Sequence, residues 1–328
     1  MSELVVTGDA QIWCRSWSCR LYSGPEYYGF LTLFFLVGMS AIFNVFTAPF
    51  FFRESRGVLG ALAVIWLCTL VCVCALLSLI FRDPGIVPKS VFFREHLNPV
   101  KGQYREKAPP MVIEIPTRTF PVRCKYCEAC GVYRAPRVTH CSACDCCMER
   151  FDHHCPWLGT CVGRRNYSIF LVFMFSLTIS TLGMIGVGIA HLALYTLDQY
   201  TNDSLNTAIQ TTLRDNIPVA ILVGIGVLFM WFIVGLFAYH CYLAANAMTT
   251  YEHIRGAFDV LGNPYDSGSW IKNICKIFAL ENRPSWVDLK SRTTHIPIRL
   301  ESEVCEPALP IVHNLSSSMA LEKPAGPE

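Results

Sequence analysis

Four long stretches of this sequence contain no Asp, Glu, Lys or Arg. They run from Tyr27 to Phe52, Val58 to Phe81, Asn166 to Leu197 and Asn216 to Tyr251. Each is longer than the roughly 20 residues that an α-helix needs to cross the hydrocarbon core of a bilayer. Hydrophobic residues make up 52% of the chain and charged residues only 16%, too apolar a balance for a soluble domain of this size. The sequence therefore predicts an α-helical polytopic membrane protein with four transmembrane helices.

The segments between these stretches give a predicted domain order. We expect an N-terminal segment at 1–28, transmembrane helices 1 and 2 within 29–81, a cysteine-rich domain at 82–168, helix 3 at 169–197, helix 4 at 216–246, a C-terminal domain at 247–298 and a disordered tail at 299–328. The segment between spans two and three is rich in Lys and Arg, whereas the two short connectors contain few. The positive-inside tendency puts the cysteine-rich domain in the cytosol, and four spans then put both termini there too.

The stretch from Cys124 to Asn166 contains nine of the chain's 17 cysteines and three histidines. Cysteines at CxxC spacing favour metal binding over a disulfide framework in a reducing compartment. Two such pairs, Cys127 with Cys130 and Cys141 with Cys144, have the spacing that presents both sulfurs to one tetrahedral zinc ion. Two pairs predict two metal sites.

Adjacent residues in an irregular segment point in different directions, so His140 and Cys141 are expected to bind different ions. One assignment gives each ion three cysteines and one histidine: Cys127, Cys130, His140 and Cys147 for the first, and Cys141, Cys144, His154 and Cys161 for the second. Such closed shells leave no open position for a substrate, so both zinc ions are predicted to be structural.

The run Asp152-His153-His154-Cys155 contains a second kind of chemistry. With His154 assigned to a metal, a carboxylate, an imidazole and a thiol remain. A neighbouring imidazole can take the proton of a thiol and so activate it as a nucleophile. We therefore interpret Cys155 as the nucleophile, His153 as its base and Asp152 as the group that orients the base. A role of His153 as an outer-shell residue or alternative ligand stays open.

These motifs resemble the DHHC protein S-acyltransferases, also known as palmitoyltransferases. The matching residues are Cys127, Cys130, Pro136, Arg137, His140, Cys141, Cys144, Cys147, Arg150 to Trp157, Cys161 to Gly163, Asn166, Tyr167 and Phe170. The resemblance implies that Cys155 takes a fatty acyl group from acyl-CoA as a thioester and passes it to a cysteine of a protein substrate. It also supports the two ligand sets. Cys124 and Cys146 are additional thiols, and Thr160 stands where many members have Asn.

The resemblance extends beyond the cysteine-rich domain. Thr249-Thr250-Tyr251-Glu252 matches the TTxE motif, which implies that Thr250 helps to hold Asp152. Asn263-Pro264-Tyr265-Asp266 matches a C-terminal motif, and Asn273 after it is expected to bond to the membrane helices. Arg134 and Arg137 match basic positions that contact the CoA headgroup. Ordinary solvated charges are the alternative for both arginines.

The implied cofactors and partners are two structural zinc ions, palmitoyl-CoA or another long-chain acyl-CoA as donor, protein substrates with membrane-proximal cysteines, membrane lipid and a possible accessory subunit. The expected location is a Golgi, endoplasmic reticulum or plasma membrane. Flanking spans argue against a nucleic-acid reader. His191 and His240 lie near the ends of their apolar runs and receive no role, and the roles of Cys124, Cys146 and Cys305 are undefined.

Two other functions remain as alternatives. Cysteine-rich turns in intracellular proteins are most often zinc modules that bind other molecules, so a non-catalytic zinc-binding membrane scaffold is the main one. A transporter ranks last because the spans contain only isolated polar residues such as Asn44.

Overall fold

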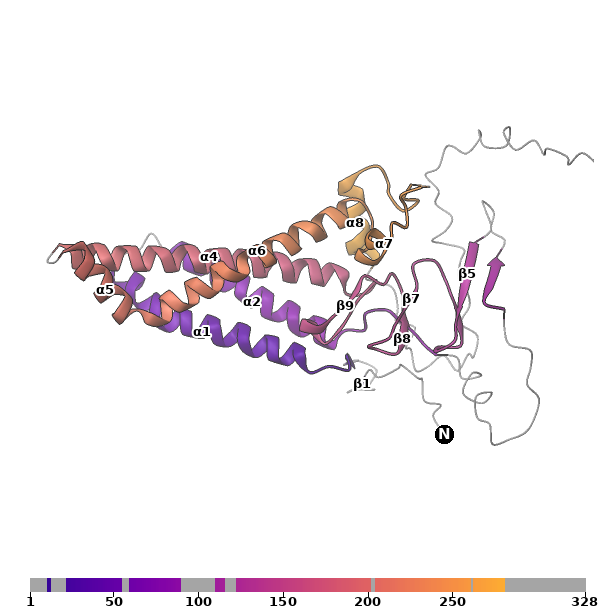
Figure 1. Cartoon of the computed structure of the whole chain (residues 1–328), viewed down its shortest axis with the longest axis horizontal. Helices are drawn as coiled ribbons and strands as arrows, with labels where there is room; N and C mark the ends of the chain where they lie inside the picture. The colour runs from indigo at the N-terminus through magenta and orange to yellow at the C-terminus, as the bar shows by residue number, and fades with distance from the viewer. Residues whose placement is uncertain are drawn as a thin grey trace, which may run out of the picture.

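The computed structural model describes residues 11–12, 22–54, 59–89, 110–115, 122–201, 204–260 and 262–280. The predicted tail at 299–328, Cys305 and most of the predicted N-terminal segment lie outside these residues. The described part is elongated, with long helices at one end and short strands at the other (Figure 1).

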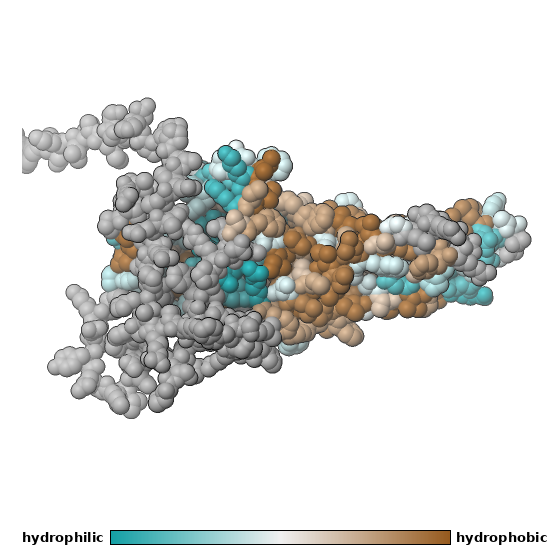
Figure 2. All heavy atoms as spheres, turned by 180° about the vertical axis from the view of Figure 1, so that it is seen from behind, coloured by the Kyte–Doolittle hydropathy of each residue, from teal (hydrophilic) through white to brown (hydrophobic). Residues whose placement is uncertain are grey.

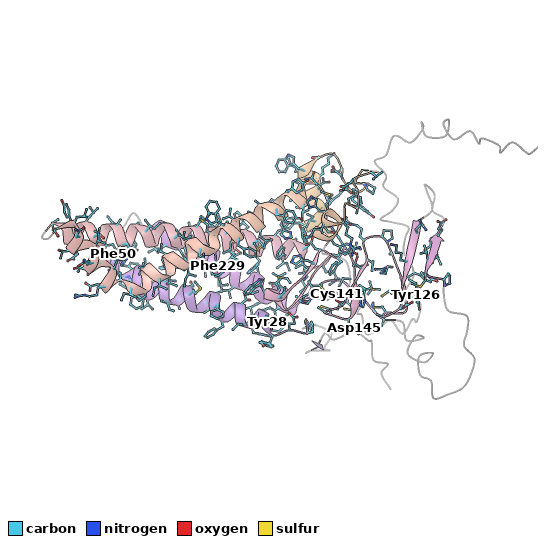
Figure 3. All side chains as sticks on the ribbon, viewed as in Figure 1. Tyr28, Phe50, Tyr126, Cys141, Asp145 and Phe229 are labelled. Carbon is cyan, nitrogen blue, oxygen red and sulfur yellow. The ribbon has the colours of Figure 1, made fainter. Side chains whose placement is uncertain are left out.

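Within the described residues, four helices are long and apolar enough to cross a membrane, which confirms the predicted fold class. They are α1 (Tyr28–Glu54), α2 (Leu59–Phe81), α4 (Tyr167–Tyr200) and α6 (Ile217–Ala245). In Figure 2 apolar residues cover the middle of this bundle on the visible face, and hydrophilic residues gather towards its ends. Phe50 and Phe229 lie on the bundle, whereas Cys141 and Asp145 lie in the strand-rich end (Figure 3).

The third helix has close neighbours on two sides, because α4 packs against both α2 and α6. A Cβ atom at Gly183 would lie 2.6 Å from Cγ1 of Ile65 on α2, and one at Gly188 would lie 2.5 Å from Cγ2 of Val223 on α6. Small residues allow helices to approach this closely in a membrane. The apolar core of the bundle therefore forms around α4.

A further helix, α5 (Leu205–Asp215), lies in the connector between α4 and α6, where the sequence analysis expected no element. The side chain of Ser204 caps it by accepting a hydrogen bond from the Thr207 N–H, and Ala208 and Thr212 are buried one turn apart. Its contacts are mainly with α4. The helix therefore covers the end of the bundle farthest from the strands (Figure 1).

Three small antiparallel sheets form the cysteine-rich domain. The outer sheet has the strand order β4 (Val112–Ile115), β5 (Val122–Cys127), β6 (Val132–Arg134). The middle sheet has the strand order β3 (Ile86–Val87), β8 (Cys146–Met148), β7 (Thr139–Cys141). The third sheet pairs β9 (His153–Cys155) with β10 (Thr160–Val162). A 3-10 turn, η2 (Pro156–Leu158), connects β9 to β10 and packs against α1. A separate two-stranded sheet pairs β1 (Gln11–Ile12) with β2 (Tyr22–Ser23).

The C-terminal part returns to this domain through α7 (Thr250–Ile254) and α8 (Trp270–Leu280). Asn273 on α8 donates a hydrogen bond of 2.7 Å to the carbonyl of Ala245, at the end of α6. It also donates to Oδ1 of Asp266 at 2.7 Å and accepts from the backbone N–H of Ser267 at 3.0 Å. Asn273 thus bonds α8 to the end of a long apolar helix.

Candidate active site and metal centres

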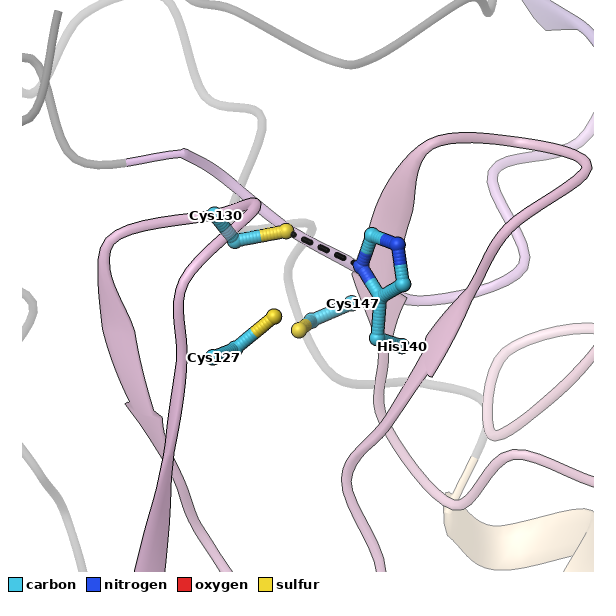
Figure 4. A group of neighbouring side chains, drawn as sticks. All are labelled: Cys127, Cys130, His140 and Cys147. Carbon is cyan, nitrogen blue, oxygen red and sulfur yellow. Dashed lines mark hydrogen bonds between the residues drawn. The ribbon is translucent and has the colours of Figure 1, made fainter. Parts of the chain in front are cut away.

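The first metal cluster connects the outer and middle sheets. Its donor atoms come from Cys127 at the end of β5, Cys130 in the following turn, His140 on β7 and Cys147 on β8, and all lie within 4.8 Å of one another. Figure 4 shows the four side chains converging, with Nδ1 of His140 at 3.3 Å from Sγ of Cys130.

The second metal cluster connects the middle sheet to the β9–β10 hairpin. Cys141 comes from β7, Cys144 from the turn after it, His154 from β9 and Cys161 from β10, and their donor atoms also lie within 4.8 Å of one another. His154 and Cys161 are paired residues of the hairpin. Nδ1 of His154 lies 3.7, 3.4 and 3.6 Å from the sulfurs of Cys141, Cys144 and Cys161.

Both clusters have the donor chemistry of a structural zinc site. Each offers three cysteine sulfurs and one imidazole nitrogen, and every cysteine in them is buried. Zinc prefers this set, in tetrahedral coordination without an open position. Cys124 and Cys146 belong to neither group among the described residues, and burial raises the pKa of both thiols, which keeps them protonated. The residues therefore fit two structural zinc ions.

The residues predicted to be catalytic lie at the same hairpin as the second cluster. Successive side chains of a strand point to opposite faces, so His153 and Cys155 share one face of β9 while His154 points to the other. Oδ2 of Asp152 lies 2.6 Å from Nδ1 of His153. Thr250 holds the same carboxylate, since its hydroxyl donates to Oδ2 at 2.8 Å and its backbone N–H to Oδ1 at 2.9 Å. Strand alternation thus separates His154, which belongs to the second cluster, from His153 and Cys155.

The charges at this site follow from these hydrogen bonds. Burial alone would raise the pKa of Asp152, but the hydrogen bond and charge of His153 and the Thr250 N–H lower it. Burial also opposes the charged form of His153, but the hydrogen bonds with Asp152 and Cys155 outweigh it and raise the pKa of His153 to about 9. Asp152 is thus an anion that makes the imidazole more basic, which suits the removal of a thiol proton.

His240 on α6 is a residue of this site that the sequence analysis missed. It is buried, and its ring centre lies 5.7 Å from that of His153 and 4.8 Å from that of Phe170. Nδ1 of His240 lies 3.2 Å from the hydroxyl of Tyr167, within hydrogen-bond distance. The available signal was a histidine inside an uncharged apolar stretch, which by default indicates function. His240 received no role in the sequence analysis because it lies near the end of the stretch, where a polar residue at the membrane interface costs little free energy.

The two arginines predicted to contact CoA differ in their surroundings. Arg137 forms a bidentate pair with Glu252 of the TTxE motif, with two contacts of 2.6 Å, and donates to the carbonyl of Ala247 at 3.0 Å. Its guanidinium carbon also lies 4.2 Å from the ring centre of Tyr265. Arg134, at the end of β6, has a buried Nε atom without a hydrogen-bond partner among the described residues. Arg137 therefore ties the cysteine-rich domain to the C-terminal part.

The fold and the site together define a multi-pass membrane protein with two cysteine-rich groups that could hold metal ions and a cysteine that shares one face of a strand with a histidine. A family model described as DHHC palmitoyltransferase matches residues 122–257. Palmitoyltransferase ZDHHC18-B of Danio rerio is 35% identical over 272 residues, which cover 79% of this chain and 67% of that protein. Human palmitoyltransferase ZDHHC9 is 32% identical over 309 residues, which cover 91% of this chain and 80% of that protein. The chain belongs to the DHHC palmitoyltransferase family, which confirms the resemblance.

Proposed function

We propose that this protein moves a long-chain fatty acyl group, palmitoyl in particular, from acyl-CoA to cysteine thiols of protein substrates through a thioester on Cys155. The observation that carries the proposal is the shared face of His153 and Cys155 on β9, with Asp152 held behind His153 by Thr250. Membership in a family of palmitoyltransferases supports the same reaction.

The reaction takes place in two thiol exchanges. His153 takes the proton of Cys155, and the thiolate attacks the carbonyl carbon of the acyl-CoA thioester. The new carbon–sulfur bond to Cys155 forms as the carbon–sulfur bond to CoA breaks. The CoA thiolate takes the proton from His153 and leaves as the free thiol. A substrate cysteine then attacks the acylated Cys155 in the same way. Both exchanges are nearly isoenergetic, so activation and positioning supply the catalysis.

The apolar surroundings of Cys155 support a fatty acyl substrate. Cys155 packs against a core cluster of the bundle that includes Leu79 and Ile80 of α2 and Phe170 and Met174 of α4. Each CH₂ group that leaves water gains roughly 0.8 kcal/mol, so an acyl chain of about sixteen carbons partitions into such an environment. Trp157, two residues after Cys155, is 65% exposed, as is common for a tryptophan at a membrane interface.

The remaining parts of the proposal concern cofactors, donor, location and partners. The two clusters would hold structural zinc, which supplies folding free energy to a domain with little core of its own. Arg134 and Arg137 contact the CoA headgroup, with Arg134 the better candidate because Arg137 is bonded to Glu252. The cysteine-rich domain and both termini are cytosolic, in a Golgi, endoplasmic reticulum or plasma membrane. Protein substrates carry membrane-proximal cysteines.

The test is the formation of an acyl-enzyme on purified protein. We expect the wild type, given palmitoyl-CoA with an alkyne label, to acquire a label that hydroxylamine removes, and Cys155→Ala to acquire none. Cys275→Ala is the matched control, because Cys275 is an exposed thiol on α8, and it should label as the wild type does. Equal labelling of Cys155→Ala and the wild type would contradict the proposal, and a wild type with bound zinc but no label would favour a non-catalytic scaffold.

A further inference from the structure

The two metal clusters use the same atom of their histidines. In each, Nδ1 faces the sulfurs, so Nε2 points away from the cluster. An imidazole that binds zinc through Nδ1 is neutral and has its proton on Nε2. That N–H needs an acceptor, and a carboxylate is a common one beside zinc-bound histidines.

At the first cluster a carboxylate of the cysteine-rich domain lies on that side of the histidine. Nε2 of His140 is 4.0 Å from Oδ1 of Asp145, which belongs to the turn between β7 and β8. This distance is longer than a hydrogen bond, and Asp145 is paired with Lys89. The carboxylate beside the first cluster thus belongs to the cysteine-rich domain itself.

At the second cluster the acceptor comes from far upstream in the sequence. Nε2 of His154 lies 3.5 Å from Oε2 of Glu26, in the segment that leads into α1. Both atoms are buried, and neither has a hydrogen-bond partner among the described residues. An unmade hydrogen bond at a buried polar atom costs about 1–3 kcal/mol. Two such atoms that face each other, one a donor once zinc is bound and the other an acceptor, form a natural pair.

The backbone fixes Glu26 in this position. The segment before α1 packs so tightly on the turn after Cys155 that a Cβ atom at Gly24 would lie 1.8 Å from the carbonyl oxygen of Gly159. Gly159 has φ of +68°, and a Cβ atom there would lie 2.2 Å from the carbonyl oxygen of Glu26. One turn into α1, the Thr32 hydroxyl donates to the carbonyl of Trp157 at 2.7 Å. The contact of Glu26 with His154 is thus part of a close interface.

We infer that Glu26 is the outer-shell carboxylate of the second zinc site, where it accepts the Nε2–H of His154 and so ties the segment before α1 to the catalytic strand β9. This role rests on the zinc sites of the proposed function. It makes the second zinc site, unlike the first, depend on a residue outside the cysteine-rich domain.

The test measures zinc release from the purified full-length protein into a coloured chelator, without acyl-CoA. Glu26→Leu keeps the size of the side chain but has no acceptor, and we expect it to release one of two zinc ions roughly ten- to hundredfold faster than the wild type. Glu26→Gln keeps an acceptor oxygen and should release that ion more slowly than Glu26→Leu. Asp145→Leu should speed release of the other ion, and Tyr27→Ala, at an exposed neighbour, should change neither.

Three outcomes would overturn the inference: wild-type release from Glu26→Leu, equal acceleration of both ions together with a lower melting temperature, or equal rates for Glu26→Gln and Glu26→Leu. A wild type that binds no zinc would instead contradict the metal part of the proposed function, so the two failures are distinguishable.

Discussion

The two metal clusters contain the same residue types, three cysteines and one histidine each, but they have different neighbours. The first joins the outer sheet to the middle sheet, and the carboxylate beside it, that of Asp145, belongs to the same domain. The second joins the middle sheet to the hairpin that contains His153 and Cys155, and it faces Glu26 from the segment before α1. We therefore expect the same chemistry to serve two purposes, because, of these two clusters, only the second includes residues of the β9–β10 hairpin and faces a residue outside the cysteine-rich domain.

The largest expected effect comes from removing one ligand of each cluster. Cys161→Ser should lower acyl-enzyme formation by more than about 100-fold, because Cys161 is on the strand that pairs with β9. Cys127→Ser, in the first cluster, should lower acyl-enzyme formation only roughly tenfold, since the loss of this ligand can affect β9 only through the middle sheet. Labelling with alkyne palmitoyl-CoA, together with the zinc content per chain, measures both. Equal losses would abolish the distinction between the clusters.

Arg137→Gln tests the link between the cysteine-rich domain and the C-terminal part. The substitution leaves Glu252, which is buried, without its bidentate partner, and we expect it to lower the free energy of unfolding by about 3 kcal/mol. Denaturation of the detergent-solubilised protein measures the change. The double variant Arg137→Gln with Glu252→Gln is the control and should recover part of the loss. Equal stability of the wild type and Arg137→Gln would show that the pair contributes nothing.

Thr250→Val tests how the catalytic strand is held from the C-terminal side. It removes the hydroxyl that donates to Oδ2 of Asp152 and leaves the backbone N–H in place. Hydrogen bonds to charged groups contribute about 1.5–3 kcal/mol, so the rate of acyl-enzyme formation should fall at least roughly tenfold. Both zinc ions should stay bound, because the two hydrogen bonds described for Thr250 go to Asp152 and not to a predicted metal ligand. Loss of the second zinc would mean that Thr250 supports the metal site rather than Asp152.

His240→Phe addresses the side of the catalytic pair that faces the membrane helices. Phenylalanine keeps a ring beside His153 but cannot form the hydrogen bond with Tyr167. We expect roughly a tenfold slower acyl-enzyme formation at unchanged zinc content, because one buried hydrogen bond is lost. His191→Phe, at the far end of the bundle, is the matched control and should keep the wild-type rate per folded molecule. Equal rates for both variants would exclude a role of His240 at the site.

The smallest expected effect is that of Lys89→Ala beside the first cluster. Lys89 pairs with Asp145, whose side chain is 42% exposed. Partly exposed ion pairs contribute less than about 1 kcal/mol, so stability should change little and acyl-enzyme formation should not change. Thermal unfolding and labelling, with Lys272→Ala on α8 as a control, measure this. A loss of acyl-enzyme formation would show that the first cluster has more influence on β9 than its position suggests.

The sequence predicted the features that depend on local pattern. Uncharged apolar runs identified all four long helices, and helix 4, expected at 216–246, is Ile217–Ala245. Helix 3, expected to end at 197, continues to Tyr200. The helix α5 was missed because its connector is short and polar, although Ser204 is a typical N-cap residue.

The spacing of the cysteines, with the adjacency of His140 and Cys141, predicted the same two groups of residues that the structure brings together. By contrast, the positions of Glu26 and His240 beside the site depend on how remote segments pack, and no local pattern in one sequence contains that information. The pairing of Arg137 with Glu252 was missed for the same reason.

Strand β7 contains one ligand of each cluster in consecutive positions, His140 and Cys141. A single peptide bond therefore joins the two metal clusters, so the register of this strand must be kept for both clusters to form. One extra residue between them would turn Cys141, the last residue of the strand, to the opposite face. Insertions at this bond should thus be far more harmful than insertions of equal length in an exposed loop.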